Sequence, residues 1–309
     1  MRILIGYDGS SCADAALDDL TRAGLPQKAE VIVISVAEVW LPPPPPSAYE
    51  IVEGVREVQV PDEPMYASAK AKAETALAHA QQARKRLQTH FPGWHVTTES
   101  AAGSPAWEII TRADQWKPDL IVVGSHGRSA LGRLVLGSVA QRVVTEARCS
   151  VRVARGRIEE PGTPVRVIAG LDGSPGSEAA VREIARRSWP KGSEVQLIVA
   201  NDPLTPTLVG EFVPGLAKAI DESNSEDRTW IEKLLEDAAR IVKPSGLAVS
   251  VKIWDGDPKR ILVEAAEKWG ADCIFVGSTG FSNRFERFLL GSISASVVAR
   301  AHCSVEVVR

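Results

Sequence analysis

The chain has 309 residues, 44% hydrophobic and 24% charged, a composition typical of a soluble globular protein with room for about two domains. Its net charge of -3 gives no reason to expect nucleic acid or an anionic membrane as a partner. The four cysteines contain no CxxC pair, which argues against zinc knuckles and disulfide scaffolds. The N-terminus lacks signal-peptide architecture, and no apolar run reaches membrane-spanning length. We therefore expect a cytoplasmic protein with reduced thiols.

In the first half, apolar and β-branched runs predict strands near residues 2–7, 31–39, 95–101, 119–123 and 150–154. Helices are predicted from near Ser11, over 66–89, after Pro105 and from Ser138, which stands where an N-cap would stand. The prolines of LPPPPPS, residues 41–47, forbid both helix and central strand. This segment is interpreted as a spacer in a surface insertion or as a polyproline ligand for a partner domain.

The second half repeats the first. RILIGYDGS, residues 2–10, matches RVIAGLDGS, residues 166–174, and KPDLIVVGSHG matches GADCIFVGSTG. Near the end of each copy, GSVAQRVVTEARCSVRVAR from Gly137 matches GSISASVVARAHCSVEVVR from Gly291. The strands of the second copy are predicted near 165–171, 194–200, 248–254, 272–277 and 304–308. We predict two domains, 1–155 and 165–309, joined by the linker 156–164, where charge, glycine and proline interrupt the pattern.

Alternating strands and helices predict an α/β fold in each copy, with a doubly wound, Rossmann-like parallel sheet and helices on both faces. In the common strand order, strands one and four are neighbours, and ligands bind outside their carboxyl ends. Strand one ends at Asp8 in the first copy and at Asp172 in the second. Strand four ends at Gly124 and at Gly277. The most distinctive stretches of each copy are therefore expected to meet at the ligand-binding edge.

The stretch GSHGRSALGRLVLGS, residues 124–138, leads from an apolar strand into a helix. Glycines let backbone amides approach an oxyanion, and a helix start favours negative charge, so a phosphate site is one interpretation. An ordinary glycine-capped turn is the other. An aspartate beside such a loop would bind ribose hydroxyls or reach phosphates through a divalent cation, although DGSS and DGSP also suit plain turns. Together these features indicate a nucleotide with several phosphates.

Several nucleotide and catalytic motifs are missing from the sequence. It has no GxxxxGK[ST], which argues against a P-loop NTPase, and no GxGxxG after the first strand, which argues against a dinucleotide dehydrogenase. GxSxG and HExxH are also absent, so hydrolase and zinc-protease functions have no support. His126 lies in the glycine segment, but its counterpart is Thr279, and we assign no catalytic residue.

The GYDGS and GSHGRSALGRLVLGS stretches resemble a universal stress protein domain, whose ATP-binding members carry GxxG, nine residues and then G[ST]. Gly124, Gly127, Gly137 and Ser138 fit that spacing without adjustment. The resemblance covers the whole chain as two tandem copies. It implies two flavodoxin-like domains, each with a five-stranded, mainly parallel sheet, that bind ATP or another adenine nucleotide, with or without Mg, in stress survival.

The resemblance also implies residue roles. It makes Asp8 the ribose or Mg contact, Val36 a backbone contact to adenine, and Gly124, Gly127, Gly137 and Ser138 the phosphate contacts. Arg128 either adds positive charge to the phosphate site or is a solvated loop arginine. The corresponding residues of the second copy are Asp172, Gly277, Gly280, Gly291 and Ser292.

The two copies differ in the length of this loop. Ten residues separate Gly280 from Gly291, where nine separate Gly127 from Gly137. One added residue either turns the following helix by about 100° or is taken up by the loop. We therefore expect two non-equivalent sites, the first being the better one.

The partner that the resemblance implies is a second copy of the domain, docked through its last strand, and here the chain supplies that copy itself. SVRVAR and SVEVVR place Arg152 and Glu306 at corresponding positions, where opposite charges are predicted to favour pairing of copy one with copy two over self-pairing. Ordinary edge-strand charge is the alternative interpretation. A further homodimer and an unknown protein partner stay open.

Three functions are considered. The leading one is a nucleotide-binding stress protein in which ATP shifts conformation or partner choice. The second is a slow ATPase or a phosphoryl or adenylyl transferase of the same fold, with Asp8 holding a metal. The third is a protein-protein scaffold that binds no nucleotide.

Overall fold

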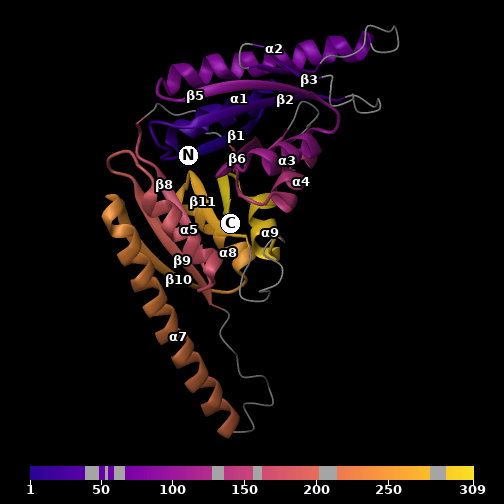
Figure 1. Ribbon diagram of the computed structural model, residues 1–309. Coiled ribbons are helices and arrows are strands. Elements are labelled where there is room, and N and C mark those ends of the chain that lie inside the picture. The colour runs from indigo at the N-terminus through magenta and orange to yellow at the C-terminus, as the bar shows by residue number, and fades with distance from the viewer. Residues whose placement is uncertain are drawn as a thin grey trace.

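The computed structural model describes residues 1–38, 49–52, 55–58, 67–126, 136–155, 162–201, 214–278 and 290–309 (Figure 1). The first half contains strands β1 (Arg2–Gly6), β2 (Glu30–Ala37), β3 (Tyr49–Val52), β4 (Val55–Val58), β5 (His95–Ala102), β6 (Leu120–Gly124) and β7 (Ser150–Ala154). Its helices are α1 (Ser11–Asp19), η1 (Leu20–Arg22), α2 (Ala67–His90), α3 (Pro105–Trp116) and α4 (Ser138–Glu146). Every strand expected in this half is present.

The second half repeats the series. Its strands are β8 (Arg166–Leu171), β9 (Glu194–Asn201), β10 (Ala248–Asp255), β11 (Cys273–Gly277) and β12 (Ser304–Val308). Its helices are α5 (Pro175–Arg186), α7 (Pro214–Val242), η4 (Lys243–Ser245), α8 (Pro258–Trp269) and α9 (Ser292–Arg300). In Figure 1 the first half lies above the second. No helix among the described residues is long and apolar enough to cross a membrane.

The described strands form one twelve-stranded sheet in the order β10-β9-β8-β11-β12-β7-β6-β1-β2-β5-β4-β3. Within each half, strands one and four are parallel neighbours: β1 pairs with β6, and β8 pairs with β11. This is the doubly wound order expected from the sequence. The halves join through an antiparallel pair, β7 with β12, in which Arg152 lies opposite Glu306. The predicted pairing of the two last strands is therefore confirmed.

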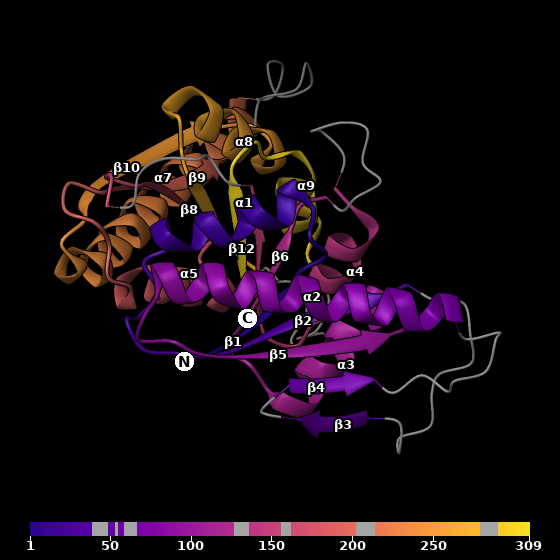
Figure 2. The same cartoon turned by 90° about the horizontal axis from the view of Figure 1, so that it is seen from above.

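A hairpin extends the first half beyond the five strands expected for each domain. Strand β4 pairs in parallel with β5, and β3 pairs antiparallel with β4, so the sheet continues past β5 (Figure 2). The hairpin follows the proline segment, for which the sequence predicts a spacer in a surface insertion or a polyproline ligand and no strands. Two four-residue runs carry too little periodicity to predict strands by themselves. Residues 41–47 lie outside the described residues, so both interpretations of the prolines stay untested.

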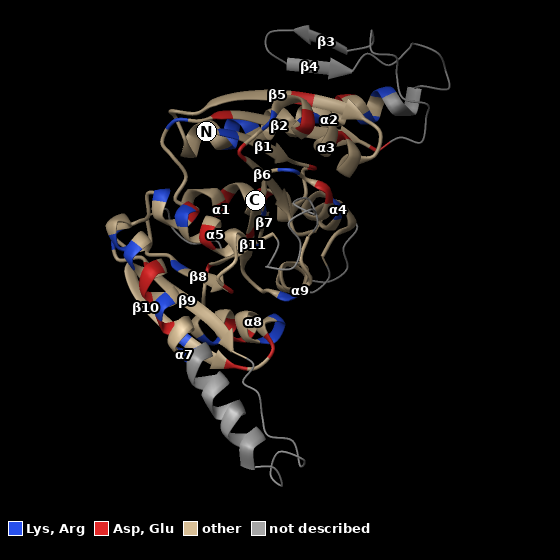
Figure 3. Cartoon of the chain, turned by 60° about the horizontal axis from the view of Figure 1, so that its bottom comes forward, with Lys and Arg blue, Asp and Glu red and all other residues tan. Residues whose placement is uncertain are grey.

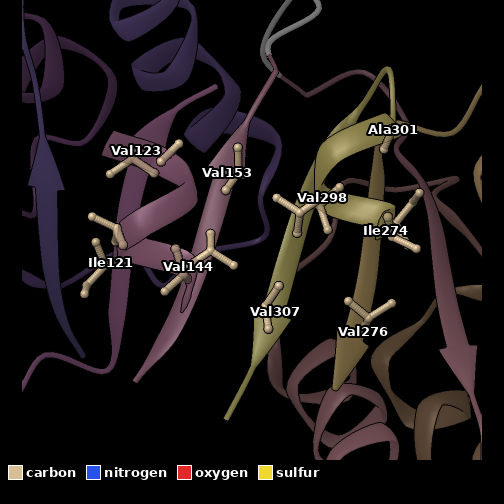
Figure 4. Close-up of a cluster of buried hydrophobic side chains, with 14 of the residues drawn as sticks. Ile121, Val123, Val144, Val153, Ile274, Val276, Val298, Ala301 and Val307 are labelled. Atoms are coloured by element: carbon tan, nitrogen blue, oxygen red, sulfur yellow. The ribbon is translucent and has the colours of Figure 1, made fainter. Parts of the chain in front are cut away.

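Helices cover both faces of the sheet. On one face, α1 and α2 pack on the first half, and α5 and α7 pack on the second, each pair over its own buried cluster. On the other face, α3, α4, α8 and α9 share one cluster that runs across the junction. Figure 4 shows Val144 and Val153 from the first half near Val298 and Val307 from the second. The two halves therefore share a continuous apolar core, which stabilises their association.

Candidate functional site

The carboxyl ends of β1 and β6 bring together the two stretches that the sequence analysis singled out. Gly6 pairs with Val123 in the β1–β6 register, so Asp8 follows β1 beside Gly124, the last residue of β6. The neighbouring strand β2 carries Val36 near its own carboxyl end. In the second half, Asp172 follows β8 beside β11, which ends at Gly277. Each half thus has one candidate ligand edge at a topological switch point.

The two aspartates form turns. The Ser10 amide donates to Asp8 Oδ1 at 3.0 Å, and the Ser174 amide donates to Asp172 Oδ1 at 2.9 Å. Ser10 is the N-cap of α1, and its hydroxyl oxygen accepts from the Ala13 amide at 3.1 Å. These contacts fit the turn interpretation of the aspartates. They are compatible with ligand binding as well, since an ionised carboxylate offers about four acceptor positions.

The ends of the glycine loops are held in the same way in both copies. The Gly137 amide donates to the Ser125 carbonyl at 2.8 Å, and the Gly291 amide donates to the Ser278 carbonyl at 2.7 Å. The Ser125 hydroxyl also contacts His126 Nδ1 at 2.9 Å, which gives that buried imidazole a structural contact. Gly127, Arg128 and Gly280 lie outside the described residues.

Helix α4 begins one residue earlier than expected. Its N-cap is Gly137, which has extended backbone angles and whose carbonyl accepts from the Gln141 amide, and Ser138 is the first helical residue. The expectation that Ser138 is the N-cap is therefore wrong. Glycine has no side chain, so no side chain caps the start of α4, and the same holds for Gly291 and α9. Helix α1, by contrast, is capped by Ser10.

The added residue of the second copy does not rotate the helix that follows. Gly137 has φ -65° and ψ 148°, and Gly291 has φ -63° and ψ 151°. With the same backbone angles and the same hydrogen bond to the preceding serine carbonyl, the two helices start alike. The extra residue therefore leaves the start of α9 as it is in α4, and the turn of the helix by about 100°, one of the two expected outcomes, does not occur.

Two of the predicted site glycines also have a packing role. A Cβ on Gly124 would lie 3.2 Å from the Cys12 carbonyl oxygen, and a Cβ on Gly277 would lie 2.4 Å from the Gly176 carbonyl carbon. The first turns of α1 and α5 thus pass directly over the ends of β6 and β11. The sequence pattern alone did not predict this requirement, because it depends on how closely a helix approaches a strand.

Acidic and basic residues are interspersed over both halves of the chain (Figure 3). Beside Asp8, the buried Tyr7 hydroxyl donates to Asp14 Oδ1 at 2.6 Å, and burial together with this contact raises the pKa of Tyr7. Within the described residues, no group of three or more His, Cys, Asp or Glu side chains could hold a metal ion.

The buried thiols give a pH-dependent prediction. Burial raises the pKa of Cys149 to about 11 and that of Cys303 to about 12, from an ordinary 9.0. Above pH 9 the unfolded chain ionises these thiols while the folded protein keeps them protonated, so the free energy of unfolding falls as pH rises. When the pH is raised from 8 to 10, the free energy of unfolding is expected to fall by about 1 kcal/mol less in Cys303→Ala than in wild type, as measured by urea denaturation. An equal loss in both proteins would contradict this assignment.

The family model and the similar proteins point to the same family. A model of the universal stress protein family matches residues 1–155 and 165–309. A universal stress protein of Mycolicibacterium smegmatis is 29% identical over 313 residues, which cover 99% of this chain and 96% of that protein. A shorter match to a universal stress protein of Methanocaldococcus jannaschii is 40% identical over 85 residues, 27% of this chain and 50% of that protein.

Solved structures share the fold over the whole length. The crystal structure of a universal stress protein from Archaeoglobus fulgidus has a TM-score of 0.62 at 19% identity and covers 100% of this chain and 96% of its own. A Pseudomonas aeruginosa protein described as functionally unknown has a TM-score of 0.59 at 14% identity, with 99% and 92% coverage. At these identities the likeness concerns the fold alone.

Proposed function

Because the chain belongs to the universal stress protein family, we propose that it binds ATP or another adenine nucleotide as a stress-response regulatory protein. The proposal places one site in each of two domains, 1–155 and 165–309, joined by the linker 156–164. ATP acts as a ligand that shifts conformation or partner choice, which requires no general base.

One observation carries the proposal: the helices that follow the glycine loops start without a side-chain cap. Helices α4 and α9 begin at glycine N-caps, whereas α1 and α5 are capped by Ser10 and Ser174. The first-turn amides of an uncapped helix, together with the positive end of its dipole, form a ready anion site. Helix α3 also starts without a side-chain hydrogen bond from its N-cap Ser104, but α4 and α9 are the helices that follow β6 and β11, beside the aspartate turns.

The family resemblance suggests a role for each predicted residue. Phosphates would contact the loop from Gly124 to Ser138, and Asp8 would bind the ribose or an accompanying Mg. The adenine would lie by the backbone of Val36 on β2, and Arg128 would add positive charge. In the second domain, Asp172, Gly277, Gly280, Gly291 and Ser292 take the corresponding places. We propose that the first domain binds more tightly, because its loop has the family spacing.

The test is a calorimetric titration of nucleotide-free protein with Mg-ATP, repeated with Gly127→Val and Gly280→Val. Each valine places a side chain in one loop, so each variant is expected to lose one site and to leave the other unchanged, while the free energy of unfolding stays close to wild type. The two single-loop variants serve as controls for each other.

The other outcomes are distinct. Equal affinity at both sites would refute the proposed difference between the domains. No binding heat, with no nucleotide released on denaturing the purified protein, would refute the function and favour a scaffold. Steady metal-dependent release of phosphate during the titration would favour the enzyme.

A further inference from the structure

The junction between the two halves contains a row of alternating charges. Arg152 Nε on β7 lies 2.7 Å from Asp19 Oδ2 at the end of α1, and Arg152 Nη1 lies 3.2 Å from Glu306 Oε2 on β12. Glu306 also accepts from Arg187, which follows α5, and Arg187 Nη2 lies 3.3 Å from Glu183 Oε1. Acidic and basic side chains therefore alternate across the junction, in the order Asp19, Arg152, Glu306, Arg187 and Glu183.

The centre of this row is removed from water. The side chains of Arg152 and Glu306 are 2% and 0% exposed. Burial by itself would lower the pKa of Arg152, but Asp19, Cys273 and Glu306 beside it outweigh burial and hold that pKa well above its ordinary value. A buried charge destabilises the protein unless a group of opposite charge pairs with it. The stability of the junction therefore depends on the charges that the partner surface presents.

The contacts at the two ends of the strand pair are reciprocal. Arg155 Nη2 donates to the Val298 carbonyl at the end of α9 at 2.6 Å, and Arg309 Nη2 donates to the Val144 carbonyl near the end of α4 at 2.6 Å. Each domain thus supplies the same arginine and the same acceptor. Two identical domains would form these contacts equally well, so they do not select a partner.

The centre of the junction is not reciprocal. The first domain presents Asp19 and Arg152, whereas the second presents Glu306, Arg187 and Glu183. Pairing of two first domains through β7 would place Arg152 opposite Arg152. Pairing of two second domains through β12 would place Glu306 opposite Glu306. Either arrangement buries like charges against each other, which destabilises the pair.

From this polarity we infer that the β7 surface of the first domain is selective for a family domain with a buried carboxylate in the middle of its last strand, and that it rejects a second copy of itself. The second domain of this chain is the partner that fits. The row of charges determines which domain pairs with the first. The reciprocal arginine contacts at the ends of the strand pair stabilise the junction but do not distinguish one partner from another. This inference does not depend on nucleotide binding.

The experiment uses the full chain, in which one substitution imitates each self-pair. Glu306→Arg places an arginine opposite Arg152, as in a pair of two first domains, and Arg152→Glu places a glutamate opposite Glu306, as in a pair of two second domains. Hydrogen exchange then measures how often the backbone amides of β7 and β12 open. We expect these amides to exchange about 100-fold faster in both variants than in wild type. Exchange at the wild-type rate in both variants would overturn the inference.

A third variant examines the charge itself. Arg152→Lys keeps the charge and loses the guanidinium fork, so the amides of β7 and β12 are expected to exchange within about tenfold of the wild-type rate. Circular dichroism shows whether each variant has folded, and the amides of β2 and β9, on either side of the junction, serve as the internal control. An Arg152→Lys protein whose junction exchanges as fast as that of folded Arg152→Glu would contradict the inference.

Discussion

Replacing Arg152 with Met is expected to lower the free energy of unfolding by about 3–5 kcal/mol, because it takes from the buried Asp19 carboxylate the cation it pairs with and leaves Glu306 with Arg187 alone. Asp19 and Glu306 both accept from Arg152, and both are buried. Methionine fills much of the volume, so the loss in stability reports mainly the missing ion pairs of Arg152 with Asp19 and Glu306. Urea denaturation followed by circular dichroism gives the measurement.

The matched control for Arg152 is Arg182→Met. Arg182 also pairs with a glutamate, Glu178, at 2.6 Å, but both side chains are more than half exposed. Exposed pairs contribute about 0–1 kcal/mol, so this variant should remain close to wild type. If both variants lost the same free energy of unfolding, the buried pairs of Arg152 would contribute no more than an exposed ion pair.

Reversing both charges should not restore stability. In the double variant Arg152→Glu with Glu306→Arg, the new glutamate would face Asp19 and the new arginine would face Arg187. Arg152 and Glu306 each pair with a residue of their own half as well as with each other, so exchanging the two charges disrupts the pairs within each half. Full recovery in the double variant would show that only the contact between the strands matters.

The second large effect is expected at the strand ends. Gly277→Ala should lower the free energy of unfolding by about 2–3 kcal/mol, because its Cβ would lie 2.4 Å from the backbone of Gly176 and α5 would have to move. The corresponding Gly124→Ala should lower it by less than about 1 kcal/mol, since the nearest atom is at 3.2 Å. Denaturation of both variants under the same conditions measures the difference.

The two glycines are equivalent in sequence, so each variant is the control of the other. Copy one has Cys12 where copy two has Gly176, and the smaller residue accompanies the closer approach of α5 to its strand. Equal losses in the two variants would contradict this explanation. A larger loss for Gly124→Ala would reverse it.

The sequence by itself determined the repeated architecture. Periods of apolar residues indicated the ten repeated strands, and the alternation of strands with helices indicated the parallel sheets. The common strand order then placed Asp8 beside Gly124, and Asp172 beside Gly277. These features depend on local pattern and on general rules of chain connection, both of which can be read from one sequence.

Other features were decided only by tertiary structure. The row of charges at the junction contains Asp19 and Arg187, which lie 133 and 119 residues from their partners Arg152 and Glu306, so no local pattern joins them. The glycine N-cap of α4 depends on how the loop returns to Ser125, and the requirement for Gly277 depends on the approach of α5. The hairpin β3–β4 is too short to predict without the edge of β5 that it covers. In each case the deciding contact is long-range or depends on close packing, and neither has a sequence signature of its own.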